Sequence, residues 1–286
     1  MAALLILVST VTHLAESLFI KHYNTKHSKG GFLFTAFVSF FSMLFFLLTD
    51  RGGFQVPREL WIYAIAAGVL YCSASFLTYV ALQIGSYAMS MLILSYSIVL
   101  SIGYGIIFLK EQVTLFTCIG LALMLVSIYL VRASKKETDK KKASFKWVIC
   151  IGIAAMGSGL FGVVQRMQQL RFDNVCTNEF MVIALSFSGC VLFLIGLKQN
   201  HKDLQYVLKN GLLWTAGAGI SNGLTNAMVV FLYTLMPISL SSPIRVGVKI
   251  LLSFVLSLLV FKERFEKRQI VGVLFGTAAL IFLNIK

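Results

Sequence analysis

Long apolar runs separated by short polar segments dominate the chain. Ten runs of 17 to 25 residues can be drawn, each long enough to cross ~30 Å of hydrocarbon as a helix. The strict alternation of apolar and polar residues expected of a barrel strand does not recur. The pattern therefore predicts ten membrane-spanning helices over 2–20, 31–49, 60–81, 87–109, 114–131, 146–165, 177–197, 211–235, 238–261 and 269–285.

The two halves of the chain resemble each other. The segment FLKEQVTLFTCIGLALMLVSIYLV, from Phe108, aligns without a gap with VFKERFEKRQIVGVLFGTAALIFL, from Val260. An odd number of spans per copy turns the second copy upside down, and inverted repeats are typical of secondary transporters. We expect a first repeat over 1–131, a basic linker over 132–145 (with the run KKETDKKK) and a second repeat over 146–286.

A pair of glycines in the last span, Gly272 and Gly276, is spaced for close helix packing. Small residues four apart let two helix backbones approach. This close contact could lie between two copies in a dimer, or between this span and the fifth span of the same chain. We favour the contact within the chain.

Composition excludes several classes of protein. The chain is 58% hydrophobic and 13% charged, with a mean hydropathy of +0.86, whereas soluble domains are about 25% charged. A soluble enzyme, a coiled coil and a disordered chain do not fit. The formal net charge is +14, but the cations gather in loops between spans, where lipid head groups explain them better than nucleic acid does.

The repeat resembles that of the drug/metabolite transporter superfamily, EamA type. In that family a loop Glu is followed by a Gly nine residues later, as in Glu111 with Gly120 and Glu263 with Gly272. The chain departs from the family pattern at the next glycine, which is replaced by Ser127 and Ala279, and has Tyr96-Ser97 and Val248-Lys249 where the family often carries a proline in the fourth and ninth spans. The resemblance implies ten helices around a central cavity, and export or exchange of amino acids or related metabolites across the plasma membrane.

Loop charges predict an orientation. The loops after the odd-numbered spans hold 17 Lys and Arg residues, and the opposite side holds 6. The positive-inside rule places the richer side in the cytoplasm and both termini outside. The resemblance implies the reverse, with both termini in the cytoplasm; we favour the charge count.

Ionisable side chains inside spans are costly and usually functional. Arg245 and Lys249 lie one turn apart on one face of the ninth span, and His13 and Glu16 lie three residues apart in the first. We expect Lys249 and Arg245 to hold a cargo carboxylate, with Glu16 and His13 balancing charge or carrying a proton. Other interpretations remain open: Arg245 could reach the head groups, Glu16 could simply pair with Lys249, and His13 could be a packing residue.

Polar side chains in other spans could complete a binding cavity. Amides and tyrosines either contact a solute or cross-link and pack helices. The candidate substrate-binding residues of this kind are Asn222, Asn226, Tyr79, Tyr96 and Ser75.

No enzyme signature such as HExxH, GxSxG or a phosphate-binding loop occurs, so we expect neither catalysis nor a cofactor or metal. The sequence predicts a secondary transporter that exports a small metabolite, an amino acid or another carboxylate-bearing solute, by alternating access. Its expected partners are that solute and the lipid bilayer, as a monomer or homodimer. The alternatives are a flippase or carrier of the same fold for a lipid-linked or phosphorylated metabolite, and a helper subunit that transports nothing.

Overall fold

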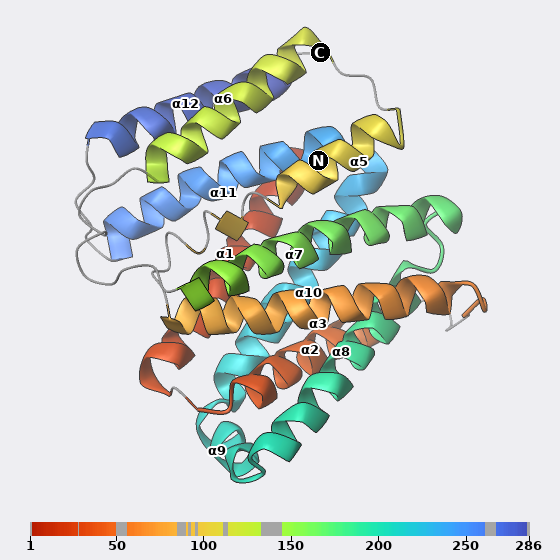
Figure 1. Cartoon of the computed structure of the whole chain (residues 1–286). Helices are drawn as coiled ribbons and strands as arrows, with labels where there is room; N and C mark the ends of the chain where they lie inside the picture. Colours follow the sequence, from red (N-terminus) through yellow and green to blue (C-terminus); the bar gives the residue numbers. More distant parts are fainter. Residues whose placement is uncertain are drawn as a thin grey trace.

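The computed structural model describes residues 2–27, 29–49, 56–84, 90, 93–94, 97–110, 114–132, 145–260 and 267–284. Within these residues the regular structure is helical, without strands. The helices are α1 (Ala2–Lys26), α2 (Gly31–Thr49), α3 (Leu60–Ile84), α5 (Ile98–Ile107), α6 (Leu115–Arg132), α7 (Phe145–Arg171), α8 (Thr177–Gln199), α9 (Lys202–Asn210), α10 (Leu212–Leu235), α11 (Ile238–Val260) and α12 (Lys267–Asn284) (Figure 1).

The helix packing repeats itself in the two halves. Three helix pairs each have a counterpart related by the repeat. The pair α1–α10 corresponds to α7–α3, the pair α2–α10 to α8–α3, and the pair α1–α11 to α7–α5. Three further pairs, α2 with α8, α5 with α11 and α6 with α12, join equivalent helices, and α11 also packs on α12. The chain is therefore an all-α protein of two inverted five-helix repeats, α1–α2–α3–α5–α6 and α7–α8–α10–α11–α12, with α9 added to the second.

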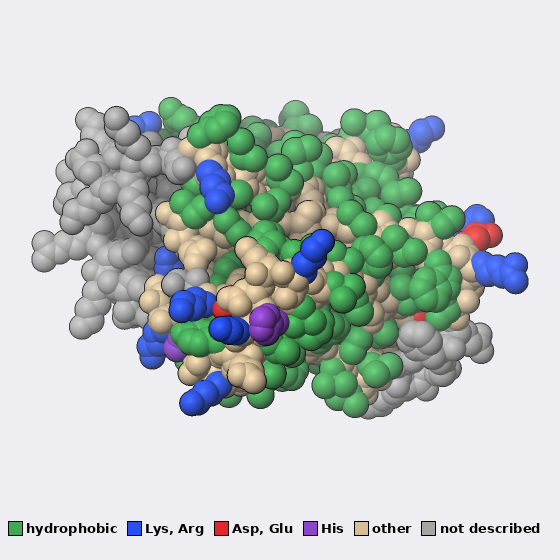
Figure 2. Space-filling model, turned by 60° about the horizontal axis from the view of Figure 1, so that its bottom comes forward, with side chains coloured by type: hydrophobic (Ala, Val, Ile, Leu, Met, Phe, Trp, Pro, Cys, Tyr) green, Lys and Arg blue, Asp and Glu red, His purple; other side chains and the backbone are tan. Residues whose placement is uncertain are grey.

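The outer surface suits a lipid environment. Among the described residues, five helices are long and apolar enough to span a membrane: α1, α2, α3, α7 and α8. Large apolar side chains such as Leu48 and Ile62 are more than 70% exposed, and Figure 2 shows hydrophobic side chains over much of one face. Exposed apolar area on this scale marks contact with lipid rather than water.

α10 and α11 are 24 and 23 residues long but are not among these five helices. Asn222 and Asn226 lower the hydropathy of α10, and Arg245 and Lys249 are the polar candidates of α11. Their polar faces turn toward the interior of the bundle, as described below.

The structure departs from the predicted spans in two places. The segment 198–210, expected to be a loop, contains the short amphipathic helix α9, which packs on α2, α8 and α10. α1 and α7 run on to Lys26 and Arg171, about six residues beyond the expected ends. Hydropathy falls over these last turns, but tertiary contacts keep them helical, since Tyr23, Gln168 and Gln169 are fully buried. Of the predicted fourth span, residues 87–89, 91–92 and 95–96 lie outside the described residues.

The glycine pair of the last span packs within the chain. Ser127 of α6 donates a hydrogen bond from its Oγ to the carbonyl oxygen of Gly272 in α12, at 2.6 Å. A Cβ at Gly276 would lie 2.8 Å from the same Ser127 oxygen. The close approach of α6 and α12 within one chain, which the spacing favoured, is therefore present in the structure.

We expect Gly219→Ala to destabilise the bundle. A Cβ at Gly219 of α10 would overlap the side chain of Phe41 and lie 2.7 Å from the carbonyl oxygen of Val38, both in α2. Because the backbone cannot move aside locally, α2 and α10 must separate. We expect this to lower the free energy of unfolding by about 2–3 kcal/mol. Thermal unfolding in detergent measures this loss. Gly152→Ala is the matched control, since a Cβ there meets nothing within 4 Å; equal melting temperatures for the two variants would contradict the prediction.

Candidate functional site

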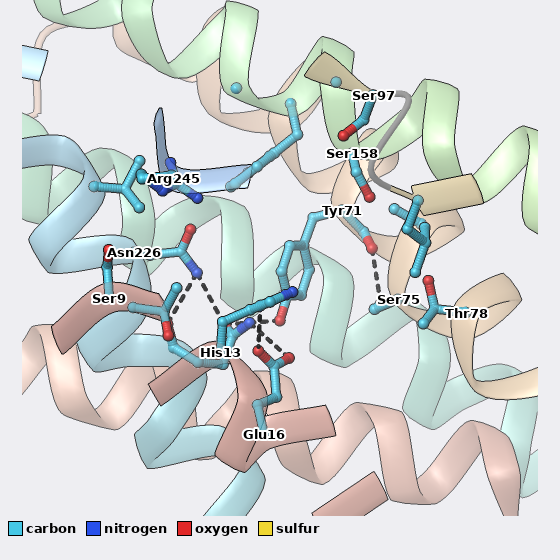
Figure 3. Close-up of a pocket in the computed structure, with 18 of the residues that line it drawn as sticks. Ser9, His13, Glu16, Tyr71, Ser75, Thr78, Ser97, Ser158, Asn226 and Arg245 are labelled. Carbon is cyan, nitrogen blue, oxygen red and sulfur yellow. Dashed lines mark hydrogen bonds and ion pairs between the residues drawn. The ribbon is translucent and has the colours of Figure 1, made fainter. Parts of the chain in front are cut away.

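A cavity of about 250 Å³ lies where the two repeats meet, lined from α1, α2, α3, α5, α7, α10 and α11 (Figure 3). Its walls combine apolar side chains with many hydroxyl groups. The lining hydroxyl residues on the described helices are Ser9, Thr10, Ser17, Thr35, Tyr71, Ser75, Thr78, Ser97, Ser101, Ser158, Thr225, Tyr233 and Ser242. Such a surface suits a small polar solute better than a bulky apolar one.

A lysine, a histidine and a glutamate form a chain along one side of the cavity. Lys249 of α11 places its Nζ 2.8 Å from Nε2 of His13 in α1, and the other ring nitrogen, Nδ1, lies 3.4 Å from Oε2 of Glu16. An ammonium group only donates, so Nε2 accepts and Nδ1 carries the hydrogen that faces the carboxylate. A neutral imidazole thus connects the cation with the anion.

Asn222 of α10 fixes the other end of this chain. Its Nδ2 donates to Oε1 of Glu16 at 2.9 Å. Its Oδ1 accepts from the hydroxyl of Tyr71 in α3 at 2.9 Å, from Ser42 Oγ in α2 at 3.0 Å and from Asn226 Nδ2 at 3.0 Å. Three donors on one oxygen leave the amide a single orientation. Side chains of α1, α2, α3 and α10 therefore hold the Glu16 carboxylate in place.

Arg245 stands apart from this network. It lies one turn before Lys249 on α11 and lines the same cavity, and Figure 3 shows its guanidinium beside Asn226. Within the described part of the chain, no hydrogen bond or ion pair of Arg245 is found. Since Lys249 and Glu16 offset each other, the described lining residues leave one positive charge in the cavity, at Arg245.

The structure brings together seven of the nine predicted site residues. His13, Glu16, Ser75, Asn222, Asn226, Arg245 and Lys249 all line the cavity. Tyr96 lies outside the described residues.

The structure places Tyr79 away from the cavity. Its side chain is 2% exposed, packs beside Phe34 with ring centroids 5.6 Å apart, and borders a separate pocket near α9. Tyr71, Ser75 and Tyr79 are four residues apart, and each step turns about 40° further round the helix. After two such steps, Tyr79 no longer lies on the face of α3 that carries Tyr71.

Ser42 and Gln165 belong to the site but were not among the predicted site residues. Gln165 of α7 lines the cavity and Ser42 bonds to Asn222. The signal for Ser42 was weak: a single hydroxyl, three residues after Ser39, in the apolar run of α2. No group of three or more His, Cys, Asp or Glu side chains that could hold a metal ion occurs among the described residues.

Comparison with known proteins agrees with this architecture. The family model described as the EamA-like transporter family matches residues 1–133 and 145–285. A protein of known crystal structure superposes with a TM-score of 0.70, over 98% of this chain and 98% of that chain, at 14% sequence identity. No curated protein sequence matches the chain at a significant level.

Proposed function

The chain belongs to the EamA-like transporter family, and from this premise we propose that it is a secondary transporter for a small carboxylate-bearing metabolite. The amino acids and other organic acids are the cargo classes that this covers. Transport proceeds outward across the plasma membrane by alternating access of the central cavity to the two sides.

The observation that carries this proposal is the unbalanced positive charge of Arg245. A guanidinium presents paired N–H donors that match a carboxylate, and such charge-assisted pairs are stronger than neutral hydrogen bonds. A cation is a poor fit, because Asn222 already bonds to the one carboxylate among the described lining residues, Glu16. Lys249 was expected to share the cargo carboxylate; beside His13, it instead acts as the counter-ion of Glu16.

The position of the site supports alternating access. Both repeats contribute to the cavity, α1, α2, α3 and α5 from the first and α7, α10 and α11 from the second. Inverted repeats around a central site can exchange conformations, so that the cavity opens to one side and then to the other. Glu16 and His13 are the groups that can exchange a proton with the cavity when the cargo leaves.

Counterflow into proteoliposomes tests the cargo class. Liposomes loaded with one unlabelled solute are mixed with the labelled form of the same solute, drawn from amino acids, dicarboxylates, phosphorylated metabolites and organic cations. We expect uptake of at least one carboxylate-bearing solute, and none in protein-free liposomes. Flux of a cation without any carboxylate would overturn the proposal, and flux of a phosphorylated solute alone would favour the carrier of phosphorylated metabolites.

A further inference from the structure

Two buried amides tie helix ends together, one in each repeat. In the first repeat, Nδ2 of Asn24 in α1 donates to the carbonyl oxygen of Tyr79 in α3, at 3.4 Å. In the second, Nε2 of Gln169 in α7 donates to the carbonyl oxygen of Val230 in α10, at 2.9 Å. We call these the Asn24 contact and the Gln169 contact.

The two contacts occupy equivalent positions in the inverted repeat. α1 corresponds to α7 and α3 to α10 in the packing described above. Asn24 lies one turn after Ile20, and Gln169 lies one turn after Gln165; both of these earlier residues line the cavity.

The acceptor sides correspond as well. Tyr79 directly follows Thr78, and Val230 directly follows Val229, and both Thr78 and Val229 line the cavity. Each amide therefore lies one turn beyond the last lining residue of its own helix, while on the acceptor helices Leu82 and Tyr233 line the cavity about one turn past the accepting carbonyl.

Because the repeats are inverted, the two contacts lie at opposite ends of the bundle. The Asn24 contact is at the end where α9 lies, since His27 at the end of α1 bonds to Tyr206 of α9. The Gln169 contact is at the end where α1 begins and α10 finishes, with Leu5 packed near Leu232. We call these the α9 end and the termini end; Figure 1 shows α3 and α7 running between them in opposite directions.

Both contacts are only half satisfied. Asn24 is 8% exposed and Gln169 is 0% exposed, and the amide oxygen of each has no hydrogen-bond partner within the described part of the chain. A buried polar atom without a partner carries a desolvation cost that offsets the bond made by its amide nitrogen. The net stability of each contact is therefore small, which suits a contact that breaks and reforms.

The termini end has an additional bond. Nη1 of Arg166 in α7 donates to the carbonyl oxygen of Tyr233 in α10, at 2.8 Å. Within a helix that carbonyl would accept from the residue four positions on, but Pro237 has no N–H. The cation fills this gap and complements the carboxyl end of the helix dipole.

We propose that the Asn24 and Gln169 contacts are two gates, one at each end of the cavity, which open alternately during transport. The proposal rests on the transport part of the proposed function and is independent of the cargo. Among the described residues, α7 and α10 are joined by two such bonds and α1 and α3 by one longer bond, so the gate at the termini end is the harder of the two to open.

Accessibility of a cysteine in the cavity tests this without any cargo. Ser158, which lines the cavity, is replaced by cysteine in a protein whose five native cysteines have been removed, and sealed vesicles are treated with a membrane-impermeant thiol reagent from either side. We expect Gln169→Met to speed labelling from the termini end about fivefold, the scale of one net hydrogen bond, and to slow labelling from the α9 end. Asn24→Leu should do the opposite.

Gln168→Met is the matched control. Gln168 is an equally buried amide on the same helix, but its Nε2 donates to the carbonyl oxygen of Cys176, at the turn before α8, and not to α10. Its labelling rates should equal those of the parent protein. Arg166→Met gives a second way to release the termini end if Gln169→Met does not fold.

The two substitutions must change the labelling rates from the two sides in opposite directions. If Asn24→Leu and Gln169→Met increase labelling from the same side, or if neither changes the rates while melting normally, the contacts are static cross-links and the proposal fails. Either result leaves the cargo assignment standing, because counterflow tests that assignment separately.

Discussion

Arg245→Gln should reduce the apparent affinity for a carboxylate cargo by about a hundredfold, the scale expected when one partner of a close charge pair is removed. The arginine is the one cation of the cavity that has no counter-ion among the described residues. Glutamine keeps two donors and a similar length but removes the charge, so the loss reports the ion pair and not the shape of the cavity. The measurement is the concentration dependence of counterflow with the best carboxylate found in the panel.

Arg171→Gln is the matched control for this experiment. Arg171 forms a surface ion pair with Glu59, with Nη2 3.0 Å from Oε2, and both side chains are more than 60% exposed. Exposed pairs of this kind contribute little, so transport should be unchanged. If Arg245→Gln retained the affinity of the parent protein, the cargo carboxylate would have to bind elsewhere, and Arg245 would be a residue that reaches the head groups.

Much of the fold follows from the sequence because a membrane constrains it strongly. In hydrocarbon every backbone polar group needs an internal partner, so an apolar run of about 20 residues can only be a helix. The pairing of Lys110-Glu111 with Lys262-Glu263 and of Gly120 with Gly272 then defines the repeat. α9 escaped prediction because it lies outside the apolar runs, and its nine residues are held by contacts with α2, α8 and α10.

The sequence could predict those residues of the candidate site that are unusual in a membrane-spanning helix. Glu16, Arg245 and Lys249 stand out because charge in an apolar helix is costly. Their partners are not anomalous: Ser42 and Tyr71 are residues that occur throughout apolar helices. Spacing along one helix places residues on a common face, but it does not say which other helix that face meets, and so the bond between Asn222 and Glu16 had to come from the structure.

The structure also separates two interpretations that the sequence left together. The sequence predicted that Arg245 and Lys249 hold one cargo carboxylate, and left open that Glu16 pairs with Lys249 and that Arg245 reaches the head groups. The distance of 2.8 Å between Lys249 Nζ and His13 Nε2 assigns the lysine to Glu16 through the imidazole. On the function proposed above, the two cations have different roles, one balancing an internal charge and the other binding the cargo, and this difference can be tested by exchanging charges.

Lys249→Met should abolish carboxylate transport, and adding Glu16→Gln should restore it in large part. The single change leaves Glu16 and Arg245 as the charges of the cavity, so the guanidinium is drawn to the carboxylate and the net charge falls to zero. The double change removes the internal pair and returns one positive charge at Arg245. Removing one partner of a buried pair costs about 3–5 kcal/mol of stability, whereas replacing both is often nearly neutral. The melting temperature should therefore fall in Lys249→Met and recover in the double variant.

Counterflow and thermal unfolding of the four proteins, namely the parent, the two single variants and the double variant, complete this cycle. Glu16→Gln alone leaves two cations, so it should bind a dicarboxylate in preference to a monocarboxylate. If Lys249 itself held the cargo carboxylate, the double variant would transport no better than Lys249→Met, and the roles of the two cations would be reversed. Recovery in the double variant instead requires that Lys249 serves Glu16 and that Arg245 alone binds the cargo.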